Sequence, residues 1–360
     1  MVAAQEGPSM RRLIAATAAI ALLAATPAFA EDGETLNVVQ SGQVIEALSR
    51  SLDGYFDRRK AIAVQDALRA RRAQLAMIRD RAKLAEALSA ITVGVSGDLH
   101  LRVSVATTSA KAAALTDAEQ ALLDQRLAYG LMAARRLPAN IGYLKLRYFE
   151  QTDAGADMVD AALGLLKDTD ALIIDLRENT GGGGAADERL LGHLSKTPLV
   201  LETIRWTQGD GRVEVQQRKV RQGPGAPLYA DRPVFVLTAA RTFSAAEAFA
   251  YSLKANGRAV LIGEKTRGGG NPANRPSPPL GFGLVVFVPN GQVVHPLTGA
   301  GWEAVGVVPD VATAPDAALT EAYRRALAVA KPLVSTPKSE KERADAVADP
   351  AATLMADQTL

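Results

Sequence analysis

The 360-residue sequence has no cysteine, which excludes disulfide bonds, thiol nucleophiles and cysteine-metal sites. Histidine is scarce: there are three, and no H-x-x-x-H or H-E-x-x-H spacing that would indicate a metal site. Neither sign of charge dominates, because 41 Lys and Arg stand against 39 Asp and Glu, so nucleic acid is not an expected partner. We therefore expect a globular fold that is stabilised by packing alone and uses no metal or organic cofactor.

Long apolar runs are also missing, and the one apolar run near the start is short. Arg11 and Arg12 precede an apolar stretch at 13–24, and Ala28-Phe-Ala30 has the small-x-small pattern of a cleavage site. We predict a signal peptide over residues 1–30, export to the periplasm or the medium, and a mature chain from about Glu31. An uncleaved anchor is the alternative. No later stretch approaches the ~18 apolar residues of a membrane helix, so no stable membrane insertion is expected after cleavage.

Hydrophobic periodicity divides the remaining chain into three parts. Residues 31–90 carry apolar side chains at helical spacing, such as Val44, Leu48 and Leu52, and predict an N-terminal helical domain. Residues 91–335 alternate between strand and helix patterns, which favours an α/β sheet with crossover helices. Residues 336–360 have few large apolar side chains and predict a flexible tail.

Local signals place the elements of the α/β part. Short strands are expected within 91–105, and the turn at Asp210-Gly211 predicts a hairpin between 199–206 and 212–220. Further strands are expected at 142–146, 171–176, 232–237, 259–263 and 283–288. Helices are expected at 116–134, 158–167, 185–194 and 245–255.

A glycine-rich segment, Asp175-Leu-Arg-Glu-Asn-Thr-Gly-Gly-Gly-Gly184, joins a predicted strand to a predicted helix. Backbone N–H groups at such a junction can face an anion. Gly181-x-Gly183-x-x-Ala186 also fits a loose dinucleotide fingerprint, with Glu202 near the position for a ribose hydroxyl. Against this, four residues separate the strand from the glycines, and export disfavours a nicotinamide cofactor. The structural alternative is a sharp turn that only glycine permits.

Ser244 admits two interpretations. Ser244-Ala-Ala-Glu247 is a capping box, in which the serine hydroxyl accepts from the Glu247 N–H and the carboxylate reaches back. A serine at a helix start also lies beside a free donor, the N–H of Ala245, and at a positive dipole end that favours an oxyanion. The segment alone favours a cap over a nucleophile.

The general base, if there is one, comes from the three histidines. His100 follows Gly97-Asp98-Leu99 at a predicted turn, where loop residues commonly carry chemistry, whereas His193 and His295 fit structural roles. Glu303 stands beside Trp302 in an apolar run, and it is either a surface residue between strands or a carboxylate that orients an imidazole or a water.

Five segments in order resemble the C-terminal processing peptidase family, serine peptidases that include tail-specific proteases and the tricorn core. They are Gly142-Tyr-Leu-Lys-Leu-Arg-Tyr-Phe149, Leu172-Ile-Ile-Asp-Leu-Arg-Glu-Asn-Thr-Gly-Gly182, Val236-Leu-Thr with Thr242-Phe-Ser-Ala-Ala-Glu247, Arg258-Ala-Val-Leu-Ile-Gly-Glu-Lys-Thr266 and Gly306-Val-Val-Pro-Asp310. The similarity covers roughly residues 91–330. It implies a ClpP/crotonase-like α/β core with an N-terminal helical domain, and the short interval from His100 to Gly142 leaves no room for a PDZ domain.

The resemblance also implies roles for the candidate residues. Ser244 matches the nucleophile, His100 and Glu303 match the histidine and glutamate of the branch that resembles the tricorn core, and Gly182, Gly181 or Ala245 match the backbone oxyanion donors. Gly269 stands where another branch has its catalytic lysine, so Ser–Lys catalysis is not expected, and Lys265 does not match. Leu99 replaces an additional serine of the tricorn core.

Two functions follow from this resemblance. The first is an exported serine peptidase that hydrolyses polypeptides. The alternative is a non-catalytic module that binds retinoid-like or other apolar ligands, because the early helical region is similar to the interphotoreceptor retinoid-binding protein branch.

Overall fold

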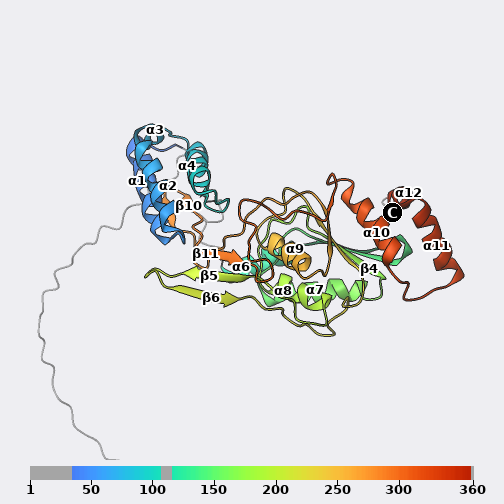
Figure 1. Cartoon of the computed structure of the whole chain (residues 1–360). Coiled ribbons are helices and arrows are strands. Elements are labelled where there is room, and N and C mark those ends of the chain that lie inside the picture. The colour runs from blue at the N-terminus through green and yellow to red at the C-terminus, as the bar shows by residue number, and fades with distance from the viewer. Residues whose placement is uncertain (1–34, 107–115, 358–360) are drawn as a thin grey trace, which may run out of the picture. The chain divides into compact units, whose positions relative to one another are not determined.

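A six-stranded sheet organises the part of the chain that the computed structural model describes, residues 35–106 and 116–357 (Figure 1). The strand order is β12-β8-β7-β4-β3-β2, parallel throughout except that β2 pairs antiparallel with β3. The strands are β2 (Leu131–Leu137), β3 (Ile141–Leu146), β4 (Ala171–Asp175), β7 (Val234–Thr238), β8 (Val260–Gly263) and β12 (Val311–Ala312). The α/β fold predicted from the alternating pattern is confirmed.

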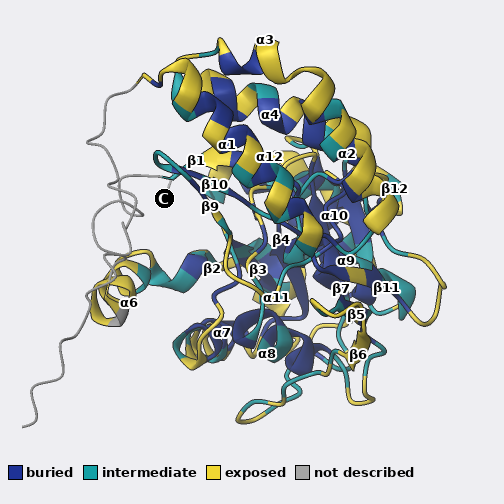
Figure 2. Cartoon of the chain, turned by 90° about the vertical axis from the view of Figure 1, so that its left-hand side faces the viewer, coloured by how far each residue is buried: buried dark blue, intermediate teal, exposed yellow. Residues whose placement is uncertain are grey.

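The central strands are buried on both faces, because helices cover the sheet on each side. Leu172 and Ile174 of β4 pack against α7 (Asp153–Leu166), α8 (Ala185–Leu194) and α9 (Ala245–Ala255). Ile173 points the other way and packs under α10 (Ala318–Val329). Successive side chains of a strand face opposite sides of its sheet, so an unbroken apolar run suits this position. Figure 2 shows β4, β7 and α9 largely in the colour of buried residues.

The sheet brings two segments of the predicted site together. β4 and β7 are parallel neighbours, with Asp175 opposite Leu237, so both chains leave the sheet at the same edge. The glycine-rich segment follows β4, and the turn to Ser244 follows β7. Crevices at the carboxyl ends of parallel strands are where α/β proteins commonly place their sites.

The N-terminal helices share a core with the strand that follows them and with two strands from residues 279–286. The helices are α1 (Val38–Ser51), the 3-10 turn η1 (Leu52–Gly54), α2 (Arg58–Ala70), α3 (Arg72–Ala76) and α4 (Arg81–Ser96). They pack on a sheet of β1 (Val103–Val105), β10 (Leu284–Val286) and β9 (Pro279–Gly281). Residue 90 is therefore not the edge of a separate helical domain, and the described residues form one compact unit.

Two predicted elements near these helices have different bounds in the structure. The predicted strands within 91–105 are reduced to β1, because α4 continues to Ser96 and ends on Gly97, a glycine in the left-handed conformation. The predicted helix at 116–134 ends early as α6 (Asp117–Arg126), followed by the 3-10 turn η2 (Ala128–Gly130) and β2. Gly130, at a φ of 87°, makes that turn.

A second three-stranded sheet lies beside the glycine-rich segment and contains the predicted hairpin. Its order is β11-β5-β6, with β5 (Thr203–Thr207) and β6 (Val213–Gln217) paired antiparallel as the Asp-Gly turn predicts. β11 (Gly291–Val294) pairs with the other edge of β5. This small sheet supplies one wall of the cavity described below.

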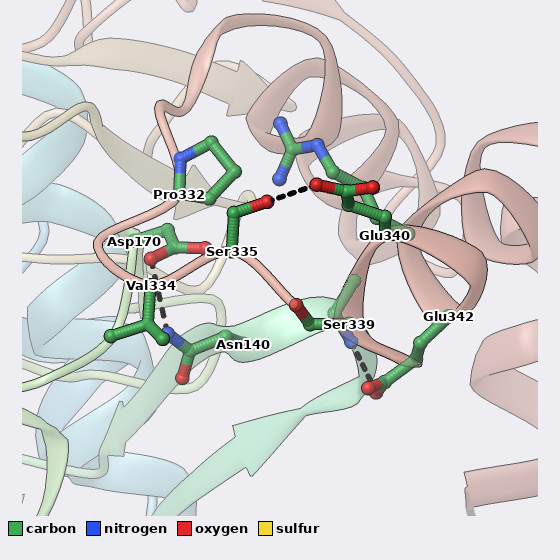
Figure 3. Close-up of a pocket in the computed structure, with 10 residues that line it drawn as sticks. Asn140, Asp170, Pro332, Val334, Ser335, Ser339, Glu340 and Glu342 are labelled. Carbon is green, nitrogen blue, oxygen red and sulfur yellow. Dashed lines mark hydrogen bonds between the residues drawn. The ribbon is translucent and has the colours of Figure 1, made fainter. Parts of the chain in front are cut away.

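The C-terminal segment, predicted to be a flexible tail over 336–360, instead forms two helices across its described part. These are α11 (Pro337–Ala348) and α12 (Pro350–Asp357), and Ala346 and Leu354 are buried beside α10. Figure 3 shows the contact between α11 and the 3-10 turn η3 (Pro138–Asn140). Glu342 of α11 accepts there from the Ala139 N–H at 2.7 Å. The cavity between these two elements has a volume of about 50 Å³, which holds water but is too small for a peptide.

Within the described residues, no helix is long and apolar enough to cross a membrane. The predicted signal peptide, residues 1–30, lies outside the described residues.

Candidate active site

Ser244 lies on a sharp turn between β7 and α9 and has a strained backbone. Its φ of 56° and ψ of −124° place a non-glycine residue where side chains are rarely tolerated. Such a conformation costs about 1–3 kcal/mol and persists only where the surroundings impose it. Thr242 imposes it here, because its buried hydroxyl donates to the Leu176 carbonyl at 2.8 Å and accepts from the Ala239 N–H at 3.0 Å. The turn holds the Ser244 side chain at the mouth of a cavity, at the start of a helix.

The capping interaction of Ser244 differs from the predicted one in one respect. The Ser244 N–H donates to the Glu247 carboxylate at 2.9 Å, as the motif predicts. The Glu247 N–H, however, bonds to the main-chain carbonyl of Ser244 at 2.8 Å, and no capping hydrogen bond goes to the Ser244 side chain. The hydroxyl is therefore left for another partner, which removes the main argument for a purely structural serine.

Glu247 does more than cap the helix, and sequence reasoning gave it no further role. Its buried carboxylate accepts from the Thr266 hydroxyl at 2.5 Å, the Gly268 N–H at 2.6 Å and the Gly269 N–H at 2.7 Å, besides Ser244. Burial raises the pKa of Glu247 to about 7, against the effect of these donors, which lower it. Glu247 thus fixes the Ser244 turn to the 266–269 loop. Its signals in the sequence were its place in the capping box and in the segment Thr242-Phe-Ser-Ala-Ala-Glu247.

We expect the Glu247→Ala variant to lose at least about 3 kcal/mol of its free energy of unfolding, because it leaves several buried donors without an acceptor. Urea denaturation followed by circular dichroism measures this loss. Asp66→Ala is the control, since Asp66 forms an exposed ion pair with Arg69 at 2.6 Å and should cost about 1 kcal/mol or less. Equal losses in the two variants would contradict the role given to Glu247.

The glycine-rich segment presents a free backbone donor to the cavity. Gly181, Gly182, Gly183 and Gly184 have φ values of 105°, 99°, 113° and 110°, which only glycine adopts readily. The Gly181 N–H is taken by the Asn179 side chain at 2.9 Å. Among the described residues, no partner occupies the N–H of Gly182 or that of Ala245. Gly182 and Ala245, both at the cavity, are thus the pair of donors that an oxyanion can use, and Gly181 is not.

Glu202, weighed as a ribose contact, has a different partner in the structure. It bonds the Arg218 guanidinium at 2.8 Å, and the same guanidinium bonds Asp187 at 2.7 Å. Glu202 is buried in the wall of the cavity, where its carboxylate is engaged. A dinucleotide fingerprint would need this acid to be free for a hydroxyl, so the structure favours the turn and oxyanion interpretation of the glycines.

His100 is packed beside the Ser244 turn, but its ring contacts Phe243 rather than the serine. The His100 and Phe243 ring centroids are 4.4 Å apart, and Phe287 lies on His100 at 5.4 Å. Nδ1 of His100 is buried without a hydrogen-bond partner among the described residues, and no hydrogen bond to Ser244 is present. Burial, with the charges of Arg267 and Arg102, lowers the pKa of His100 to about 4 although Asp98 opposes this. The imidazole is neutral at pH 7, as a general base must be.

Glu303 and Asp98 hold the His100 loop in place. Glu303 accepts from the N–H groups of Leu99 at 3.1 Å, Gly270 at 2.5 Å and Asn271 at 2.9 Å. It lies near His100, but its hydrogen bonds go to these main-chain donors and not to the imidazole. Burial and the charge of Asp98 raise the pKa of Glu303.

Asp98 is a site residue that sequence reasoning passed over. It is fully buried and accepts from the His100 N–H at 2.9 Å, the Tyr55 hydroxyl at 2.9 Å and the Asn271 amide at 3.0 Å. Donors thus occupy Asp98, as they occupy Glu303. This makes a metal ion a poor fit for the Asp98, His100 and Glu303 group, although their ligand atoms lie within 4.8 Å of one another.

Gly269 explains why this site has no place for a lysine. A Cβ on Gly269 would lie 2.1 Å from the Phe243 ring and 2.7 Å from Cε1 of His100. No side chain fits there unless both rings move. The space beside Gly269 is therefore filled by the rings of His100 and Phe243, and a lysine side chain at position 269 would compete with them for it. This agrees with the expectation from the sequence that Ser–Lys catalysis is not available.

A cavity of about 170 Å³ opens beside Ser244. Its walls are mostly apolar, with the charged pair Glu202 and Arg218 on one side. The apolar lining consists of Ile204, Ala245, Ala248, Pro272, Val293 and Trp302. The other histidines do not line it: His193 of α8 bonds Asp160 of α7 at 2.7 Å, and His295 is buried beside Tyr251. The volume and lining of the cavity suit a small or medium apolar side chain.

Parts of the chain are similar to known peptidases. Residues 140–313 match peptidase family S41. The carboxyl-terminal-processing protease of Picosynechococcus sp. is 34% identical over 149 residues, which cover 41% of this chain and 34% of that protein. The chloroplastic carboxyl-terminal-processing peptidase 3 of Arabidopsis thaliana is 30% identical over 181 residues, which cover 48% of this chain and 31% of that protein. The aligned regions thus span about a third of these relatives.

A solved structure shares the fold over most of the chain. The crystal structure of a protein from Parabacteroides merdae aligns with 81% of this chain and 98% of its own, at a TM-score of 0.54 and 20% identity. At that identity the likeness establishes the fold, and the chemistry has to be argued from the residues described above.

Proposed function

We propose, on the premise that residues 140–313 are a peptidase family S41 domain, that the chain is a serine peptidase with Ser244 as its nucleophile and His100 as its general base. One observation carries the proposal. Ser244 has a strained backbone, a hydroxyl without a capping role, and two unoccupied N–H donors at the same cavity. A helix cap needs none of these features, whereas acyl transfer uses the free hydroxyl and the two donors, and backbone strain is typical of functional sites.

The chemistry follows from the atoms at the site. His100 takes the Ser244 proton as Oγ attacks the peptide carbonyl, and the Gly182 and Ala245 N–H groups stabilise the oxyanion. His100 then gives that proton to the leaving amine, and an acyl-serine remains. A water, deprotonated by His100, releases the acid product and regenerates Ser244. Glu303 and Asp98 act as positioning residues through the loop that carries His100.

Substrate binding completes the contact between Ser244 and His100 in this account. Nδ1 of His100 is enclosed, which leaves Nε2 as the ring nitrogen for proton transfer. Catalytic hydrogen bonds are often long in free enzymes and shorten when substrate is bound. The Phe243 ring, 4.4 Å from His100, is the group that must adjust for this to happen.

We propose that the cavity beside Ser244 binds the substrate side chain on the acyl side of the scissile bond. Ala248→Phe should then lower kcat/KM for peptides with Leu at that position by about tenfold or more relative to peptides with Ala, because the ring fills the space. Peptide pairs that differ only there measure the ratio. Ile204→Ala, which enlarges the same cavity, should move the ratio the other way. If neither variant changes the ratio of kcat/KM between the Leu and Ala peptides, the substrate side chain does not bind in this cavity.

The alternative, a non-catalytic module for apolar ligands, is not favoured, because the matched relatives are named as a protease and a peptidase. We also propose that the protein is exported, on the basis of the signal peptide predicted at residues 1–30. Polypeptides are the proposed substrates.

A further inference from the structure

Tyr55 connects the N-terminal helices to the loop that carries His100. It follows η1, is 3% exposed, and packs in the same apolar core as the helices α1 to α4. Its hydroxyl donates to Oδ2 of Asp98 at 2.9 Å, and Oδ1 of Asp98 accepts from the His100 N–H at 2.9 Å. Two hydrogen bonds through one buried carboxylate therefore link a residue of the N-terminal helical segment to the proposed general base.

The Asp98 carboxylate depends on such donors, because it is fully buried. Its Oδ2 accepts from two side chains that come from distant segments, the Tyr55 hydroxyl at 2.9 Å and the Asn271 amide at 3.0 Å. A buried carboxylate is costly unless hydrogen bonds replace those it made to water. Tyr55 thus supplies one of the donors that hold Asp98 in its place and charge state.

The same carboxylate lies beside the imidazole of His100. One oxygen of Asp98, one ring nitrogen of His100 and one oxygen of Glu303 lie within 4.8 Å of one another. A negative charge at this distance favours the imidazolium, which forms when His100 takes the Ser244 proton. Asp98 therefore holds the main chain of His100 and, through its charge, favours the protonated ring.

We propose that Tyr55 is a positioning residue, whose hydroxyl fixes the Asp98 carboxylate where it supports proton transfer by His100. The inference rests on the proposed function, in which His100 is the general base. It gives the N-terminal helices a part in the active site, because Tyr55 lies outside residues 140–313, which match the peptidase family. Asn271, the second donor to the same oxygen, lies within that range.

The Tyr55→Phe variant removes one oxygen atom and keeps the ring. We expect kcat toward peptides to fall about tenfold with KM unchanged, because one hydrogen bond to a charged group is lost and no contact with substrate is. Tyr143→Phe is the matched control, since the Tyr143 hydroxyl also donates to a buried carboxylate, that of Asp175 at 2.6 Å, and this variant should keep the wild-type kcat. Equal losses of kcat in the two variants, or no loss in Tyr55→Phe, would overturn the proposal.

A double-mutant cycle separates a role through His100 from a general loss of structure. The rate at which a fluorophosphonate labels Ser244 is measured in the wild-type protein, in Tyr55→Phe, in His100→Gln and in the double variant. If Tyr55 acts through His100, Tyr55→Phe slows labelling about tenfold when His100 is present and does not slow it further in the His100→Gln background. Equal slowing in both backgrounds would contradict the role, because damage to the fold would act in either one.

The outcomes also separate this inference from the proposed function. If His100→Gln is labelled slowly and Tyr55→Phe as fast as the wild-type protein, Tyr55 has no such role and the peptidase stands. If His100→Gln is labelled as fast as the wild-type protein, His100 is not the general base. NMR of the imidazole resonances, which come from three histidines, then still tests the link without turnover. The His100 resonances should move in Tyr55→Phe and not in Tyr143→Phe, and resonances that stay in place in both variants would overturn the inference.

Discussion

The Ser244→Ala variant should lose about 10⁴- to 10⁶-fold in kcat toward peptides, the range seen when a serine nucleophile is removed. Its stability should not change. No capping hydrogen bond goes to the Ser244 side chain, and alanine keeps the Cβ, so backbone strain at a φ of 56° is the same in both proteins. Peptide cleavage and thermal unfolding of the same preparations measure the two effects.

Ser104→Ala is the matched control, because Ser104 is exposed on β1 and should be replaceable without loss. A Ser244→Ala variant that retains wild-type turnover would exclude Ser244 as the nucleophile. A loss of turnover together with a loss of stability would instead return Ser244 to the structural role of a helix cap.

The His100→Gln variant should lose about 10²- to 10⁴-fold in kcat/KM, which is the contribution of a general base. The wild-type pH profile carries a second expectation. The base must be neutral, and burial together with Arg267 and Arg102 disfavours the imidazolium, although Asp98 favours it. The limb of the activity profile that reports His100 should therefore lie near pH 4, rather than in the usual range near 6.5.

The pH profile of kcat/KM for a peptide without titrating groups measures this acid limb. Replacing His193 of α8, which bonds Asp160 of α7, should leave the limb in place. A limb centred near 6.5 would mean that His100 is solvated in the active state. If the residual activity of the His100→Gln variant shows the same acid limb, the limb reports the titration of a group other than His100.

Local signals account for the parts of this structure that the sequence predicts well. The helices predicted at 185–194 and 245–255 have these bounds in the structure, because a glycine or serine starts each one. The strands around them are buried on both faces and read as unbroken apolar runs. The pairing of β4 with β7, which brings the glycines and Ser244 together, is seen only in the structure.

The remaining features depend on contacts between distant residues, which no local pattern contains. Glu303 reaches the Leu99 N–H across 204 positions, and Phe243 covers His100 across 143. The C-terminal helices show the same limit. Their composition predicts a loose tail, yet Ala346 and Leu354 are buried beside α10, and Glu342 accepts from the distant Ala139 N–H.

The central claim is that Ser244 forms a covalent acyl intermediate with the help of His100. Labelling with a fluorophosphonate, followed by peptide mapping, tests it most directly. Trypsin releases Thr242–Lys254, which contains Ser244 and Ser252, and fragmentation separates the two. We expect a single adduct on Ser244 in the wild-type protein and a much slower reaction in His100→Gln. An adduct on Ser252 or elsewhere, or none in a preparation that cleaves peptides, would contradict the account.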